Sequence, residues 1–155
     1  MSESTDATAR SAAGQREPLD GPGWVLLAAG GLMLANGIWM FIDPAHWYEE
    51  LPAAVPDFGP LNAHFVRDIA CAFTTMGAAL VWSALRPPLR APLVSFVAAF
   101  LALHALLHIR DTALGVVASN HWWLDLPGVY GPAVLMAWLA LRFVREARSA
   151  ATASP

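Results

Sequence analysis

Long apolar stretches, separated by short polar or proline-rich segments, dominate the pattern of this chain. Four of them run over residues 23–42, 65–85, 92–109 and about 126–144. Each approaches the roughly 20 residues that a helix needs to cross about 30 Å of hydrocarbon. We therefore predict an all-α fold, a bundle of four transmembrane helices at about 23–42, 60–85, 92–111 and 126–148, within a membrane domain spanning residues 23–149.

The segments around these helices predict how the bundle is connected. Residues 1–22 and 150–155 are small and polar, which is typical of disordered tails. Prolines at 87, 88 and 92 predict a tight turn, so the second and third helices are expected to be antiparallel neighbours. Residues 43–52, bounded by two prolines, form either a short helix on the membrane surface or an irregular loop. Asp125 is a candidate cap for the fourth helix, and Pro132 is expected to bend it.

Composition supports a membrane protein and excludes several classes of function. Hydrophobic residues make up 57% of the chain and charged residues only 14%, against about 25% charged in an ordinary soluble domain. The lipid bilayer is therefore the expected surroundings. A single cysteine excludes an intrachain disulfide and any multi-cysteine metal site. A net charge of −3 with no lysine argues against nucleic-acid binding.

The arginines predict the orientation of the bundle, because positive residues flanking spanning helices stay on the cytoplasmic side. Arg67 and Arg110 fall on one side of the predicted topology. The other seven fall on the opposite side, at positions 10, 16, 86, 90, 142, 145 and 148. Both termini are thus expected in the cytoplasm, with the first and third loops outside.

Ionisable residues inside the second and third helices are the strongest functional lead, since such residues are rare in spanning segments and usually face the bundle interior. His64, Asp68, Cys71 and Thr75 share one face of the second helix, and His104, His108 and Asp111 share one face of the third. The two faces match in depth, roughly 5 to 10 Å below the outer boundary. We expect them to meet in one polar site, made of His64, Arg67, Asp68, His104, His108, Arg110 and Asp111.

The residue types leave several uses for this site open. His64, Asp68, His104 and His108 offer ligands for a transition metal, and His64 with His108 could clamp a haem. The same groups could bind a quinone or an acidic lipid head group, or relay protons. The structural alternative is a hydrogen-bonded network in which Arg67 pairs with Asp111 and Arg110 with Asp68, leaving no net charge.

Other polar and small residues are weaker leads. Asn36 is expected to form an interhelical hydrogen bond or to reach the polar site, and Cys71 is either an inert apolar residue or a ligand or redox thiol. His46 and His121 are expected at the membrane interface. Four glycines are expected to permit close helix packing, namely Gly30, Gly31, Gly37 and Gly77.

The stretch from Gly31 to Met40, the Asp-Pro and Trp-Tyr pairs that follow, and His64-Phe65-Val66-Arg67-Asp68 together resemble small four-helix bacterial inner-membrane proteins of the DoxX-like kind. The resemblance covers roughly residues 24–145, and its most specific part is the element at 64–68. It implies a multi-pass protein of the bacterial inner membrane, with a possible link to quinone-coupled sulfur oxidation. We match no catalytic residue to that activity and do not carry it over.

Two hypotheses about function result. In the first, the protein is an integral inner-membrane protein whose buried His/Asp/Arg site near the outer face binds a metal, a haem, a quinone or a proton. In the second, it is an accessory or assembly subunit, bound to another membrane protein or to its own copies, and the polar residues only orient the helices. No reaction can be named from the residues.

Overall fold

The computed structural model describes residues 18–153, and the expectations for residues 1–17, 154 and 155 lie outside the described part. All its regular elements are helical, as predicted. Four helices are long and apolar enough to cross a membrane by length and composition, with spans at Gly21–Ile42, Ala63–Leu85, Pro87–Ala113 and His121–Ala153. The fold therefore suggests a multi-pass membrane protein.

The first half of the chain forms a helical hairpin with a structured loop. Helix α2 (Gly21–Ile42) begins at Asp20, whose carboxylate accepts a hydrogen bond from the backbone N–H of Gly23 at 2.9 Å. The short α3 (Pro44–Glu50) follows at once, capped by Asp43. A 3-10 turn, η1 (Val55–Phe58), leads into α4 (Ala63–Leu85), which is capped by Asn62. Of the two alternatives for residues 43–52, the structure has the short helix.

The second half forms another hairpin. The prolines make the tight turn η2 (Pro87–Leu89), from which α5 (Arg90–Ala113) starts directly. After a loop come α6 (His121–Leu124), the π-helical turn η3 (Leu126–Tyr130) and α7 (Gly131–Ala153). Pro132 has no N–H to give to the carbonyl of Gly128, and the helix takes the wider π form directly before it.

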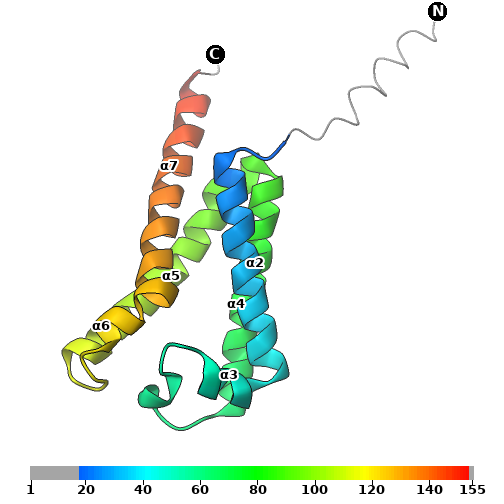
Figure 1. Cartoon of the computed structure of the whole chain (residues 1–155). Coiled ribbons are helices and arrows are strands. Elements are labelled where there is room, and N and C mark those ends of the chain that lie inside the picture. The colour runs from blue at the N-terminus through cyan, green and yellow to red at the C-terminus, as the bar shows by residue number, and fades with distance from the viewer. Residues whose placement is uncertain (1–17, 154–155) are drawn as a thin grey trace, which may run out of the picture.

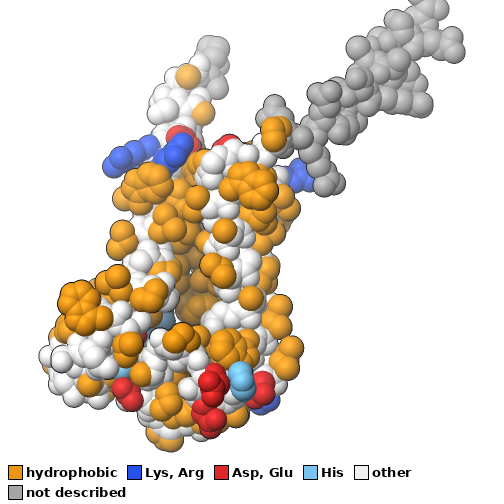
Figure 2. Space-filling model, in the orientation of Figure 1, with side chains coloured by type: hydrophobic (Ala, Val, Ile, Leu, Met, Phe, Trp, Pro, Cys, Tyr) orange, Lys and Arg blue, Asp and Glu red, His pale blue; other side chains and the backbone are white. Residues whose placement is uncertain are grey.

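The two hairpins pack internally more than against each other (Figure 1): α2 lies along α4 and α5 along α7, while α4 and α5 share a shorter contact. The start of α2 and the end of α7 lie at the same end of the molecule, and α3 and α6 lie at the other. Apolar side chains cover the middle, and charged side chains gather toward both ends (Figure 2). A polypeptide crossing a bilayer needs this distribution.

Glycines bring α2 and α4 into backbone contact. A Cβ atom added to Gly30 would lie 2.8 Å from the carbonyl oxygen of Gly77, and one added to Gly37 would lie 2.6 Å from Oγ1 of Thr74. Both distances are too short for a real side chain, so close packing at these glycines is confirmed. The same expectation for Gly31 is wrong, because a Cβ there would meet nothing within 4 Å.

Candidate functional site

The polar face of α4 does not meet the polar face of α5. His64 and Asp68 contact each other, with Nε2 and Oδ2 3.5 Å apart, but their side chains are 88% and 62% exposed. Cys71 and Thr75 on the same face are exposed as well. The expectation of one shared polar site on the two helices is therefore wrong. Burial of the small residues Ala70 and Gly77 against α2 turns this face of α4 outward.

The two ion pairs of the structural alternative, Arg67 with Asp111 and Arg110 with Asp68, do not form among the described residues either. Nη1 of Arg110 instead lies 2.6 Å from Oδ1 of its neighbour Asp111. Nε of Arg67 donates to the backbone carbonyl of Phe41, at the end of α2, at 3.1 Å. Arg110 thus pairs with a neighbour in its own helix, and Arg67 bonds to the end of α2. The partner of Asp68 is His64 in the same helix.

A different cluster of ionisable residues is buried at the α6 end of the molecule. Asp125 stands at its centre, with no exposed side-chain surface. One carboxylate oxygen lies 2.8 Å from Nδ1 of His108 on α5, and the other lies 3.4 Å from Nδ1 of His121 on α6. Nε2 of His121 in turn lies 3.2 Å from Oδ2 of Asp57, in η1. We call these four residues, Asp57, His121, Asp125 and His108, the His/Asp relay.

The relay runs from the surface into the interior. The Asp57 side chain is 47% exposed, that of His121 is fully buried, and that of His108 is 14% exposed. The ring of Phe58 covers both imidazoles, with centroid distances of 4.9 Å to His108 and 4.8 Å to His121. Water therefore has its most direct access to the relay at Asp57.

Local structure explains how these residues come together. His121 and Asp125 are one helical turn apart, so their side chains share a face of the short α6 segment. His108 lies in the next-to-last turn of α5, and Thr112 donates its hydroxyl to the His108 carbonyl at 3.0 Å. Asp57 and Phe58 arrive from the loop before α4, where Ala54 and Gly59 adopt positive φ values of 48° and 125°. The relay therefore joins three segments that are far apart in sequence.

Proton counting constrains the charge of the relay. A neutral imidazole has one N–H, so His121 can donate to only one of the two carboxylates beside it, whereas an imidazolium donates to both. A buried carboxylate such as Asp125 needs a cation or a proton to compensate for lost hydration. The buried Asp125 carboxylate therefore needs either a proton of its own or a proton on one of the neighbouring imidazoles.

His104 extends the polar character one turn deeper into the bundle and forms no hydrogen bond with residues 18–153. Its ring lies 4.6 Å from that of His108, centroid to centroid, and stacks at 6.1 Å on Phe100. Phe73 of α4 meets its edge at 6.3 Å. Thus His104 and His108 do lie together, as the sequence predicted, but the residues that join them come from α6 and η1.

Sequence reasoning missed three of the four relay residues. His121 was expected at the membrane interface and is fully buried, and Asp125 was expected as a helix cap but its side chain caps nothing. Asp57 is not among the residues that the sequence singles out. The spacing of His121 and Asp125, in a segment that is otherwise Trp-Trp-Leu, was the available signal, since two ionisable residues four apart share one helix face.

The other residues that the sequence singled out do not add to the relay. Asn36 accepts a hydrogen bond from Nε1 of Trp47 at 2.9 Å, so it anchors α3 and does not reach the relay. Among the described residues, no three His, Cys, Asp or Glu side chains are arranged to hold a metal ion. His64 and Asp68 lie apart from His104 and His108, so the structure gives no support to the metal site expected from these four residues.

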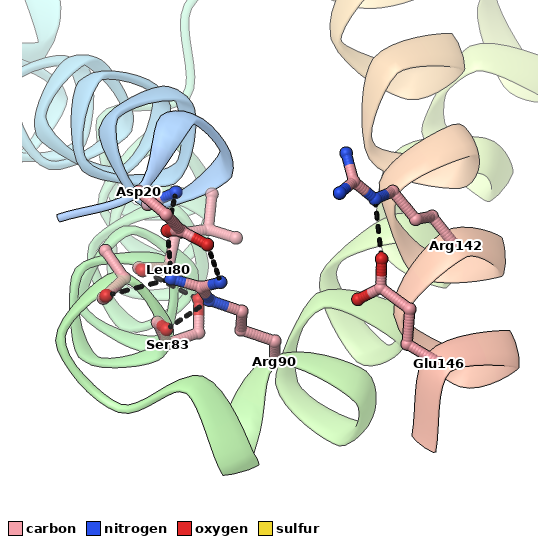
Figure 3. A network of polar contacts seen from close by, with 8 residues as sticks. Asp20, Leu80, Ser83, Arg90, Arg142 and Glu146 are labelled. Carbon is pink, nitrogen blue, oxygen red and sulfur yellow. Dashed lines mark hydrogen bonds and ion pairs between the residues drawn. The ribbon is translucent and has the colours of Figure 1, made fainter. Parts of the chain in front are cut away.

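A second buried charge lies at the opposite end of the bundle (Figure 3). Arg90, 9% exposed, forms a bidentate pair with Asp20 at 2.6 and 2.7 Å. Its guanidinium also donates to the Ser83 carbonyl at 3.4 Å and lies 5.6 Å from the centre of the Phe143 ring. The hydrogen bonds from Arg90 lower the pKa of Asp20 below its ordinary value of 3.8. Arg90 thus connects the start of α2, the end of α4 and the start of α5, and it packs against the middle of α7.

Comparison with known proteins adds no relative. No protein-family model matches the chain, and no curated protein or solved structure is significantly similar to it. The DoxX-like resemblance accordingly stays a prediction.

Proposed function

We propose that this protein is a multi-pass membrane protein whose His/Asp relay takes up protons at the membrane surface and passes them into the bundle. The single observation that carries the proposal is the position of Asp125. Its fully buried carboxylate lies between two imidazoles, one on each oxygen, in a chain that reaches the surface at Asp57. Intramembrane His/Asp chains of this kind are typical of proton relays.

The proposed path needs no group that the chain lacks. A proton arriving at Asp57 is transferred to Nε2 of a neutral His121, and the proton on Nδ1 of that ring passes to Oδ1 of Asp125. Asp125, protonated beforehand on Oδ2, releases that proton to Nδ1 of His108, which becomes an imidazolium. Imidazoles suit this transfer because one ring nitrogen can accept a proton while the other donates one.

The membrane and its sidedness belong to the same proposal. Five arginines near the end where α2 begins and α7 finishes support placing that end in the cytoplasm: Arg86, Arg90, Arg142, Arg145 and Arg148. Asp57 then faces the outside. A bacterial inner membrane fits this arrangement, with the bilayer as the surroundings of the four spans.

A pH jump followed by infrared spectroscopy tests the relay. We expect protonation of the histidines in the purified full chain to be at least about tenfold slower in Asp57→Asn, because an acidic group at the entrance raises the rate of cation arrival. Glu49→Gln, a charge removal at an exposed site on α3, is the matched control and should leave the rate unchanged. An unaltered rate in Asp57→Asn would remove the case for a relay.

A structural role in an accessory subunit is the second candidate, favoured by the fact that the relay joins η1, α5 and α6. In that case Asp57→Asn should lower the unfolding temperature while protonation kinetics stay the same. Measuring both quantities on one variant separates the two functions.

A further inference from the structure

The loop before α4, which brings Asp57 and Phe58 to the relay, has few polar attachments. The backbone hydrogen bonds of residues 53–61 join groups only two or three residues apart. Of the described side chains outside the relay, only that of Tyr48 on α3 forms a hydrogen bond with this segment. Its hydroxyl donates to the backbone carbonyl of Gly59 at 2.9 Å. Tyr48 therefore supplies the hydrogen bond that ties the loop to a helix.

Helix α3, which carries Tyr48, is itself held against α2 by two hydrogen bonds. Nε1 of Trp47 donates to Oδ1 of Asn36 at 2.9 Å. Nε1 of Trp39 donates to Nδ1 of His46 at 3.1 Å. A side chain on a fixed helix positions its partner more precisely than one on a loop does. The Tyr48 hydroxyl thus fixes the loop relative to the first spanning helix.

The same loop carries both an entrance to the relay and a shield over it. The ring of Phe58 lies 4.9 Å from that of His108 and 4.8 Å from that of His121, centroid to centroid. Phe58 is 37% exposed, so its other side faces the surroundings. An apolar ring in this place limits contact between water and the imidazoles, and closing a site in this way prevents proton leakage. Asp57 is then the polar group through which a proton reaches them.

The closed position of the loop depends on contacts with other elements. Ala54 has a φ of 48°, in the left-handed region where a residue with a Cβ atom is strained. Such backbone persists only where the surrounding structure holds it, and the four-residue η1 is too short to be stable alone. We propose that Tyr48 is a positioning residue, which holds Phe58 closed over the relay imidazoles so that protons enter at Asp57. Only the last clause rests on the proposed proton uptake.

Tyr48→Phe removes the hydroxyl and keeps the ring. Without the bond to Gly59 the loop should open more often, because one hydrogen bond of ordinary strength changes such an equilibrium about fivefold. Diethyl pyrocarbonate acylates accessible imidazoles, and peptide mass spectrometry gives the rate at each histidine of the purified full chain. His108 and His121 should react about fivefold faster in Tyr48→Phe. His64, with a side chain that is 88% exposed, is the internal reference.

Two comparisons separate loop opening from general loosening. Thr152→Val also removes a hydroxyl that donates to a backbone carbonyl at 2.9 Å, but at the opposite end of the molecule (Figure 1), and should change no rate. His104 contacts the rings of Phe73 on α4 and Phe100 on α5, so its rate should stay the same in Tyr48→Phe. Unchanged rates at the two relay imidazoles in Tyr48→Phe, or an equal rise at His104, would overturn the proposal.

Proton uptake supplies a readout that a merely structural tyrosine would not change. With Asp57→Asn the direct entrance is lost, so the remaining protonation of the histidines after a pH jump depends on loop opening. Adding Tyr48→Phe to Asp57→Asn should therefore speed that protonation about fivefold. Equal rates in the single and double variants would contradict the positioning role. If Asp57→Asn alone is not slowed, the relay fails, and the acylation rates alone decide on Tyr48.

Discussion

Nδ1 of His108 lies 2.8 Å from Oδ2 of Asp125, although the two residues are 17 apart in sequence, one in α5 and the other directly after α6. The carboxylate is fully buried and its other oxygen faces His121. This pair therefore connects α5 to the start of the last span through a desolvated charge. Its partners, and not water, must balance that charge.

Asp125→Leu should destabilise the protein strongly, because it leaves two buried imidazoles without their acceptor. Removing one partner of a buried ion pair typically costs about 3 to 5 kcal/mol. Unfolding of the purified protein in mixed detergent micelles would measure the change. Glu146→Gln, which removes an exposed pair with Arg142, is the control and should cost less than about 1 kcal/mol. Equal effects of the two variants would show that the buried pair contributes no more than a surface one.

Gly77→Ala should also destabilise the bundle, since the added Cβ would lie 2.8 Å from the backbone nitrogen of Leu34 and 2.9 Å from the carbonyl oxygen of Gly30. Helix α2 would have to move away from α4, at a cost of about 1 to 3 kcal/mol. Gly31→Ala is the matched control for Gly77→Ala, because it makes the same substitution within a spanning helix. The Cβ added at Gly31 would meet nothing within 4 Å. Gly31→Ala should be neutral or stabilising, because alanine favours helix. A thermal unfolding series on both variants tests this, and a neutral Gly77→Ala would refute the close crossing.

The sequence predicted the spans well because each is a continuous apolar stretch of the required length, a property of neighbouring residues alone. The turn at Arg86 to Pro92, which joins α4 to α5, followed from proline chemistry in the same way. The sequence did not predict which side of α4 faces the interior of the bundle. Helix α4 has polar residues on one side and Gly77 with other small residues on another. Backbone contact between Gly77 and Gly30 of α2, not polarity, decided which side faces inward.

The candidate site was predictable only in part for a related reason. His104 and His108 are close because one helix holds them four residues apart, which the spacing alone predicts. Asp57 and His121 are 64 residues apart, and their contact depends on how the loop after α3 folds back over α6. No local pattern contains that information, so the four-residue relay was visible only in the structure.

Asn36→Val should release α3 from the bundle. Nε1 of Trp47 donates to Oδ1 of Asn36 at 2.9 Å, and a seven-residue helix is too short to be stable without such contacts. Backbone amides of α3 should therefore exchange with deuterium faster, by about fivefold to tenfold for a lost bond worth roughly 1 kcal/mol. His46→Ala removes the exposed contact with Trp39 and serves as the comparison, with a smaller effect. Exchange rates equal to those of the unaltered chain would show that α3 is held by other contacts.

Asp20 should make the stability of the bundle sensitive to acid. Arg90 lowers the pKa of this carboxyl in the folded protein below 3.8. The ionised form is therefore favoured by folding, and its contribution is present above the ordinary carboxyl range and lost as the pH falls through the lowered value. Asp20→Asn keeps an oxygen that can accept from the backbone N–H of Gly23, because asparagine is also a good N-cap, and removes only the charge.

The unfolding temperature of Asp20→Asn should consequently be lower than that of the unaltered protein near neutral pH, and the difference should shrink as the pH falls toward about 2. The change should stay within about 1 kcal/mol, since the Asp20 carboxylate is half exposed and screened. Glu146→Gln removes another carboxylate at the same end of the bundle and should not reproduce the acid dependence of Asp20→Asn, because that pair lies apart from Arg90 in Figure 3. A difference between Asp20→Asn and the unaltered chain that is constant with pH would mean that the Asp20 charge does not contribute through Arg90.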